Sequence, residues 1–154
     1  MGSYSKILVG TDGSESSFKA VEQAARLAKD SGASLLVASA YAAMSDREQR
    51  RAAEALGEES YKVVGSHPAE DILREAADLA KKAGAKDVES VCEPGDPVDV
   101  LVSVIDKQKV DLCVIGNRGL NSLAGRLLGS VPANISHRAA CDVLIVHTTS
   151  GRGR

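Results

Sequence analysis

Residues 116–130 read Gly-Asn-Arg-Gly-Leu-Asn-Ser-Leu-Ala-Gly-Arg-Leu-Leu-Gly-Ser, and they follow the apolar run Asp-Leu-Cys-Val-Ile at 111–115. An apolar run of this length is typical of a strand that is buried on both faces of a parallel sheet. The glycine-rich stretch therefore leaves the carboxyl end of a central strand, and we expect it to form a binding loop there.

The composition of this loop favours an anion as its ligand. Gly116, Gly119 and Gly129 allow the backbone to approach a ligand closely, so that successive N–H groups converge on a negative charge. Ser130 is a good N-cap and Pro132 fits the first helical turn, so we predict a helix over 131–138. The dipole and unpaired amides of such a helix also favour an anion at its start.

The spacing of the glycines resembles that of a known family. Gly116-x-x-Gly119, nine residues and then Gly129-Ser130 is similar to the Gly-2x-Gly-9x-Gly-(Ser/Thr) signature of the nucleotide-binding branch of the universal stress proteins. The chain looks like the small single-domain type of this family. A phosphate loop of the Walker type is excluded, because no GxxxxGK[ST] occurs.

The rest of the sequence alternates strand and helix patterns. Apolar runs predict five strands, and segments with helical spacing and capping residues predict four helices between them, which indicates an α/β fold with a doubly wound parallel sheet. The resemblance implies a Rossmann-like sheet of order 3-2-1-4-5 with helices on both faces. The expected strands are 6–10, 33–41, 87–93, 111–115 and 142–146. The expected helices are one capped by Asp12 or Ser14 that ends at Gly32, one over 68–83, one that starts at Pro97 after the cap Asp96 and has an apolar face through Ile105, and one over 131–138.

Length and composition limit the organisation and the class of the protein. We expect a single domain over 1–149, with 42–67 as an insert or lid and 150–154 as a disordered tail. The net charge of −2 and the absence of Trp argue against binding to nucleic acid. We interpret the three cysteines, Cys92, Cys113 and Cys141, as buried reduced thiols. The chain has no apolar run of membrane length or of signal-peptide type. Together these features predict a cytoplasmic protein.

The resemblance also implies which residues contact the ligand. Val9–Ser14 looks like the first-strand turn of the family, which places Asp12 near the ribose, the phosphates or their metal, and the backbone around Ala40 at the adenine edge. Two alternatives stay open: Asp12 as a helix cap only, and Ala40 as core only. The phosphates are then expected against Gly116, Gly119, Gly129, Ser130 and Val131, with Arg118 either binding them or solvated.

The leading hypothesis is a binding module for ATP or cyclic AMP that acts by occupancy in stress signalling or nucleotide buffering. We find no catalytic arrangement and no metal-ligand spacing, so turnover is at most slow hydrolysis; Mg²⁺ is possible if ATP is the ligand. One alternative is a nucleotide-cleaving enzyme related to ATP pyrophosphatases, because residues 10–14 superficially resemble their loop. Another is a purely structural dimerisation module, since the last strand can pair in a homodimer.

Overall fold

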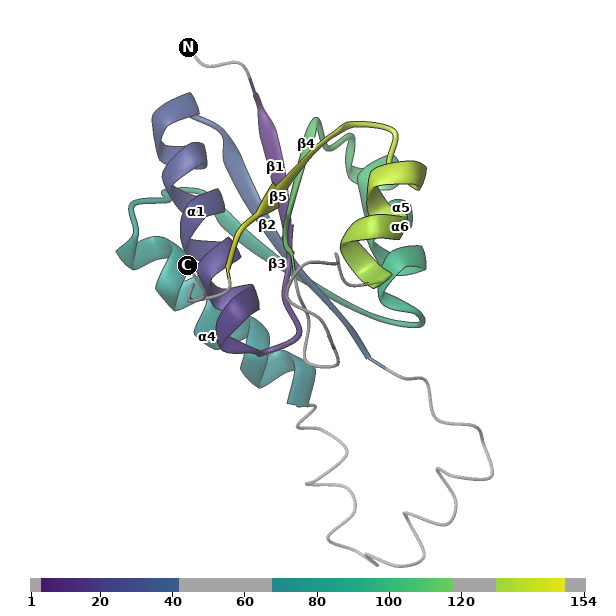
Figure 1. Cartoon of the computed structure of the whole chain (residues 1–154). Helices are drawn as coiled ribbons and strands as arrows, with labels where there is room; N and C mark the ends of the chain where they lie inside the picture. Colours follow the sequence, from purple (N-terminus) through teal and green to yellow (C-terminus); the bar gives the residue numbers. More distant parts are fainter. Residues whose placement is uncertain (1–3, 42–67, 118–129, 149–154) are drawn as a thin grey trace, which may run out of the picture.

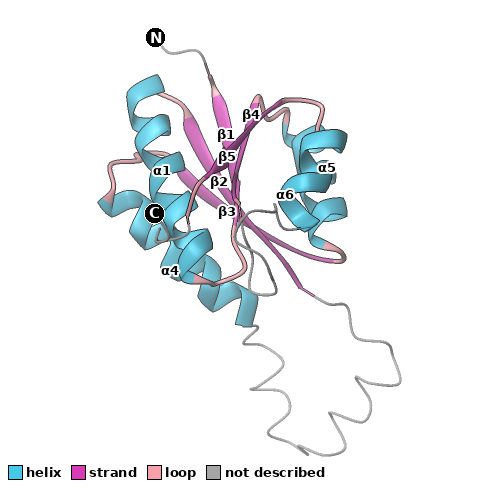
Figure 2. Cartoon of the chain, in the orientation of Figure 1, coloured by secondary structure: helices cyan, strands magenta, loops and turns pink. Residues whose placement is uncertain are grey.

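The structure is a computed structural model that describes residues 4–41, 68–117 and 130–148. Five strands form one parallel sheet of order β3-β2-β1-β4-β5, as expected (Figures 1 and 2). The strands are β1 Lys6–Gly10, β2 Ser34–Tyr41, β3 Val88–Pro94, β4 Leu112–Gly116 and β5 Asp142–Val146. The helices are α1 Glu15–Ser31, α4 Pro68–Lys82, α5 Pro97–Gln108 and α6 Ser130–Arg138. None of the described helices has the length and apolar character needed to cross a membrane.

The helix boundaries follow from capping residues. Ser14 is the N-cap of α1, where its side chain accepts a hydrogen bond from the Ser17 N–H, and Gly32 ends the helix in the left-handed region at φ 68°. Asp96 caps α5 and accepts from two backbone N–H groups, and Pro97 occupies the first turn. The sequence predicted both ends of α1 and the start of α5, because caps act locally.

The helices cover the two faces of the sheet in pairs, which confirms the doubly wound fold (Figure 1). On one face, α1 and α4 pack on the strands through residues such as Val21, Leu73 and Ala76. On the other face, α5 and α6 pack through residues such as Leu101, Val104 and Ile135. The two central strands β1 and β4 are buried from both sides, which explains their continuous apolar sequences.

The last strand differs from the prediction. The apolar run at 142–146 predicts a buried strand. In the structure, β5 lies at the edge of the sheet, where the implied order 3-2-1-4-5 places it, and its apolar residues 143–146 are only half-buried. A hydrophobic run alone does not distinguish an edge strand from a central one. The strand β3 lies at the opposite edge, and its charged and polar residues are typical of an edge strand.

The cysteines also differ from the prediction in part. All three are free, but only Cys113 is buried, whereas Cys92 and Cys141 are half-buried. Burial raises the pKa of the Cys113 thiol to about 12, so this thiol stays protonated at neutral pH. Cys92 and Cys141 lie on or beside the edge strands β3 and β5, where the sheet gives them less cover.

Candidate functional site

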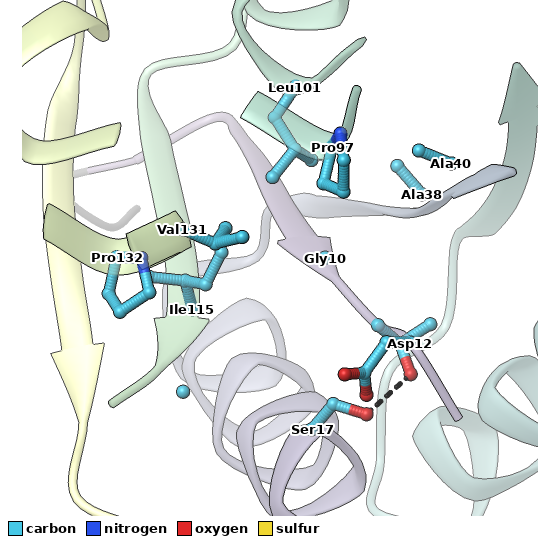
Figure 3. A pocket seen from close by; sticks show the side chains of 12 residues that line it. Gly10, Asp12, Ser17, Ala38, Ala40, Pro97, Leu101, Ile115, Val131 and Pro132 are labelled. Carbon is cyan, nitrogen blue, oxygen red and sulfur yellow. Dashed lines mark hydrogen bonds between the residues drawn. The ribbon is translucent and has the colours of Figure 1, made fainter. Parts of the chain in front are cut away.

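A pocket lies at the carboxyl ends of the strands, between the central neighbours β1 and β4 (Figure 3). The strand order reverses between β1 and β4, because β2 follows on the far side of β1 and β5 follows on the far side of β4. Doubly wound sheets bind their ligands at such a switch point. The cavity has a volume of about 130 Å³, comparable with cavities that accept a single aromatic ring. Its lining residues are Gly10, Thr11, Asp12, Ser17, Ala38, Ala40, Pro97, Leu101, Ile115, Gly116, Val131 and Pro132.

One side of the pocket is apolar, and we call it the apolar slot. It exists because the strands carry small residues there: Ala38 and Ala40 project little from β2, and Gly10 has no side chain. A Cβ on Gly10 would lie 3.2 Å from Leu101 Cδ1, so even a methyl group would enter the slot. The slot is lined by Gly10, Ala38, Ala40, Pro97, Leu101, Ile115, Val131 and Pro132.

The other side of the pocket is polar and comes from the turn between β1 and α1. The hydroxyls of Thr11 and Ser17 are hydrogen-bonded at 2.7 Å, and both side chains are buried (Figure 3). Ser17 Oγ donates to the Ser14 carbonyl at 2.9 Å, so the Thr11 hydroxyl must donate to Ser17. Thr11 Oγ1 also accepts from the Gly13 N–H at 3.2 Å. These hydrogen bonds hold the turn in one conformation, so that Thr11 and Ser17 form the polar wall of the pocket.

Asp12 lies at the rim of the pocket and is exposed. Its Oδ1 accepts a hydrogen bond from the Ser14 N–H at 2.9 Å, so the carboxylate supports the turn, while the N-cap of α1 is Ser14. The interpretation of Asp12 as the helix cap is therefore wrong, and its carboxylate lines the pocket instead.

The N-terminus of α6 closes the pocket together with the end of β4. Helix α6 begins at Ser130, one residue earlier than expected, and Val131 and Pro132 of its first turn line the cavity. Gly116 lines the pocket with its backbone. A Cβ on Gly116 would lie 3.5 Å from Ser16 Oγ and 3.3 Å from Thr148 Cγ2, so a side chain there would meet these two residues. The unpaired amides of a helix start make this end of the pocket suitable for an anion.

Four of the residues predicted to contact the ligand therefore come together in one pocket: Asp12, Ala40, Gly116 and Val131. Ala40 is half-buried and faces the cavity, so it is not only core. Ser130 begins α6, and its side chain is outside the described part of the structure. Arg118, Gly119 and Gly129 lie outside the described residues, as do the expected lid 42–67 and the tail 150–154.

Several pocket residues escaped the sequence analysis, and they are Gly10, Thr11, Ser17, Ala38, Pro97, Leu101, Ile115 and Pro132. Leu101 shares the helical spacing of the apolar residues Val98 and Ile105, which predicts a core position, and it is 4% exposed. The same side chain also borders the cavity. Thr11 and Ser17 could have been found from the sequence, because both carry hydroxyl groups and lie close to the turn that follows the first strand. Within the described residues, no group of three His, Cys, Asp or Glu is placed to hold a metal ion.

Comparison with known proteins identifies the family of the chain. The model of the universal stress protein family matches residues 3–147. The universal stress protein Rv1636 of Mycobacterium tuberculosis is 54% identical over 149 residues, which covers 97% of this chain and all of that protein. A crystal structure of a universal stress protein in complex with cAMP is 46% identical, with a TM-score of 0.71, and the match covers 95% of this chain and 98% of that one.

A more distant solved structure supports the fold alone. The universal stress protein from Archaeoglobus fulgidus, solved in complex with dAMP, is 21% identical with a TM-score of 0.66, over 92% of this chain and 97% of that one. The family match spans nearly the whole chain, and the sheet order is the one that the glycine signature implied. The chain therefore belongs to the universal stress protein family.

Proposed function

We propose that this chain binds an adenine nucleotide in the pocket between β1 and β4, and that it acts through occupancy of this pocket, in stress signalling or nucleotide buffering, without efficient turnover. The observation that carries the proposal is the meeting of an apolar slot and a helix N-terminus in one cavity. A nucleotide has the same two ends, a flat apolar base and an anionic phosphate.

The base fits the apolar slot. Ala38 and Ala40 provide a shallow floor on β2, and α5 and α6 supply apolar walls through residues such as Leu101 and Val131. Burying a flat ring between such side chains is favourable because it removes apolar surface from water. The backbone of β2 around Ala40 supplies N–H and C=O groups for the adenine edge.

The phosphate belongs at the start of α6, beside Gly116. Amides of the first helical turn at Ser130 and Val131 supply donors, and the helix dipole favours negative charge there. Arg118, Gly119 and Gly129 remain predicted phosphate ligands. Asp12, at the rim of the cavity, accepts hydrogen bonds from the ribose hydroxyls.

Two nucleotides are candidates. The 46% identical protein that was solved with cAMP favours cyclic AMP, whose single phosphate requires only amide donors and one cation. ATP is the other candidate; its triphosphate would bring Mg²⁺, for which Asp12 is the acidic residue at the pocket.

We also propose a cytoplasmic homodimer that pairs through β5. Among the described strands, β5 lies at the sheet edge and pairs only with β4, and its apolar residues are half-buried along its length. An edge of this kind is a template for pairing with a second copy. The three free cysteines are consistent with a reducing compartment. Sedimentation should give a dimer at micromolar concentration, and a monomer would contradict the pairing.

Titration calorimetry with cyclic AMP and with ATP, each with and without Mg²⁺, tests the ligand. We expect saturable binding of one nucleotide per chain, with cyclic AMP binding independent of Mg²⁺. Absence of binding to either nucleotide at about 1 mM, which corresponds to roughly 4 kcal/mol of binding free energy, would contradict the proposal. Steady ATP hydrolysis abolished by Asp12→Ala would instead favour an enzyme.

A further inference from the structure

Buried polar side chains are concentrated at the carboxyl edge of the sheet. The described residues of this kind are Thr11, Ser17, Ser39, Asn117 and Thr148. Thr11 and Ser17 line the pocket, but Asn117 and Thr148 lie behind its wall: a Cβ on Gly116 would be 3.3 Å from Thr148 Cγ2. Burial of a polar group is costly unless the group is hydrogen-bonded. The hydrogen-bond partners of Asn117 and Thr148 therefore indicate which parts of the backbone these side chains hold in place.

Asn117 is joined to the end of β5 by its backbone and its side chain. Its N–H donates to the Val146 carbonyl at 2.9 Å. Its Oδ1 accepts from the Thr148 N–H at 2.9 Å and from the Thr148 hydroxyl at 3.0 Å. Since Oδ1 faces these donors, Nδ2 must face His147 Nδ1, at 3.4 Å, as the donor. Asn117 is therefore held in one orientation.

Thr148 continues the network to α1. Its hydroxyl hydrogen goes to Asn117, so the hydrogen bond between Thr148 Oγ1 and Ser16 Oγ must be donated by Ser16. Lys19 Nζ donates to the Thr148 carbonyl at 3.2 Å. Gly116 packs against this network, because its missing Cβ would be 3.6 Å from the Ser16 carbonyl oxygen as well. One face of the Gly116 backbone lines the pocket, and the other rests on Ser16 and Thr148.

We propose that Asn117 is a positioning residue for the phosphate end of the nucleotide, acting through Thr148 on the backbone of Gly116. The inference rests on the proposed function and extends it to two residues that do not line the pocket. Loss of the Asn117 side chain leaves the buried Thr148 N–H without its acceptor, so the end of β5 and the Gly116 peptide must shift. The apolar slot is walled mainly by β2, α5 and α6, so binding of the base should change little.

Calorimetry with cyclic AMP and with adenosine, which lacks the phosphate, separates positioning from general damage to the fold. Asn117→Ala should weaken cyclic AMP about ten- to thirtyfold and adenosine less than threefold. Thr148→Val keeps the shape but removes the hydroxyl, and it should weaken cyclic AMP about three- to tenfold. In the double variant, the loss should not exceed that of Asn117→Ala by more than twofold, because both changes break one network.

Ser136→Ala is the matched control, since it removes an exposed hydroxyl that donates to the Ala133 carbonyl on the surface of α6; its cyclic AMP affinity should stay within twofold. Should Asn117→Ala fail to fold, as judged by circular dichroism, Thr148→Val carries the test alone. Equal losses for the two ligands, additive losses in the double variant, or affinities within twofold of wild type would overturn the positioning role. If the wild-type chain binds neither ligand, the proposed function falls and takes this inference with it.

Discussion

The two faces of the sheet differ at its carboxyl edge. On the face covered by α1, hydroxyl and amide side chains of Ser16, Asn117 and Thr148 fill the space behind β4. On the face covered by α5 and α6, small residues on β1 and β2 leave the space open, and the apolar slot results. The position of the pocket is thus set by where side-chain volume is missing as much as by the glycine signature.

Shortening a wall of the slot should have the largest effect. Leu101 is 4% exposed and belongs to the core under α5 as well as to the slot. Leu101→Ala should lower the free energy of unfolding by about 2–5 kcal/mol, because it removes buried methyl groups and leaves a cavity. Chemical denaturation measures the loss, and a change below about 1 kcal/mol would show that the slot wall is not part of the core.

Filling the slot should weaken nucleotide binding strongly while leaving the fold intact. Ala40→Leu places a larger side chain on the floor of the pocket, so we expect roughly 100-fold weaker nucleotide binding, or about 2.7 kcal/mol. The control Ala140→Leu makes the same change at an exposed residue on the amino side of β5. Calorimetry on both variants tests this expectation; normal affinity in Ala40→Leu would place the ligand elsewhere.

The two glycines of the pocket allow the same substitution to be compared on the two faces. Gly116→Ala puts its methyl group against Thr148 and Ser16, so it should cost about 1–3 kcal/mol of stability by overpacking. Gly10→Ala puts its methyl group beside Leu101 in the slot, so it should weaken nucleotide binding about tenfold in addition to a similar loss of stability. Melting and calorimetry on the pair measure both quantities, and identical profiles would remove the distinction between the faces.

The smallest effect is expected at the rim. Asp12→Ala removes a carboxylate that lines the pocket and accepts the Ser14 N–H, and it should cost about 0.5–1.5 kcal/mol of nucleotide binding. Asp12→Asn keeps a side-chain oxygen acceptor and should lose less. Equal losses in Asp12→Asn and Asp12→Ala would indicate that the negative charge itself, for example toward Mg²⁺, matters for binding, because both variants lack the charge and only Asn keeps the oxygen acceptor.

The sequence predicted the elements of the fold and their order because the signals for these are local. Caps such as Ser14 and Asp96 accept hydrogen bonds from amides two or three residues away. The continuous apolar runs of β1 and β4 predict that both strands are buried. The glycine spacing identified the family and, through it, the sheet order. Burial of β5 was overestimated, because apolar composition does not report how many neighbours a strand has.

By itself, the sequence determined an alternating α/β chain with its caps and a glycine signature after the fourth strand. Only the tertiary structure decided that Thr11, Pro97 and Leu101 share the pocket with the predicted residues, since the segments that carry them are far apart in the chain and meet through parallel pairing of the strands and packing of α5 on the sheet. It also decided that Thr148 stands behind Gly116 and bonds to Ser16, 132 residues away. Periodicity reports whether a residue is buried, but contacts between distant segments depend on the packing of the whole sheet.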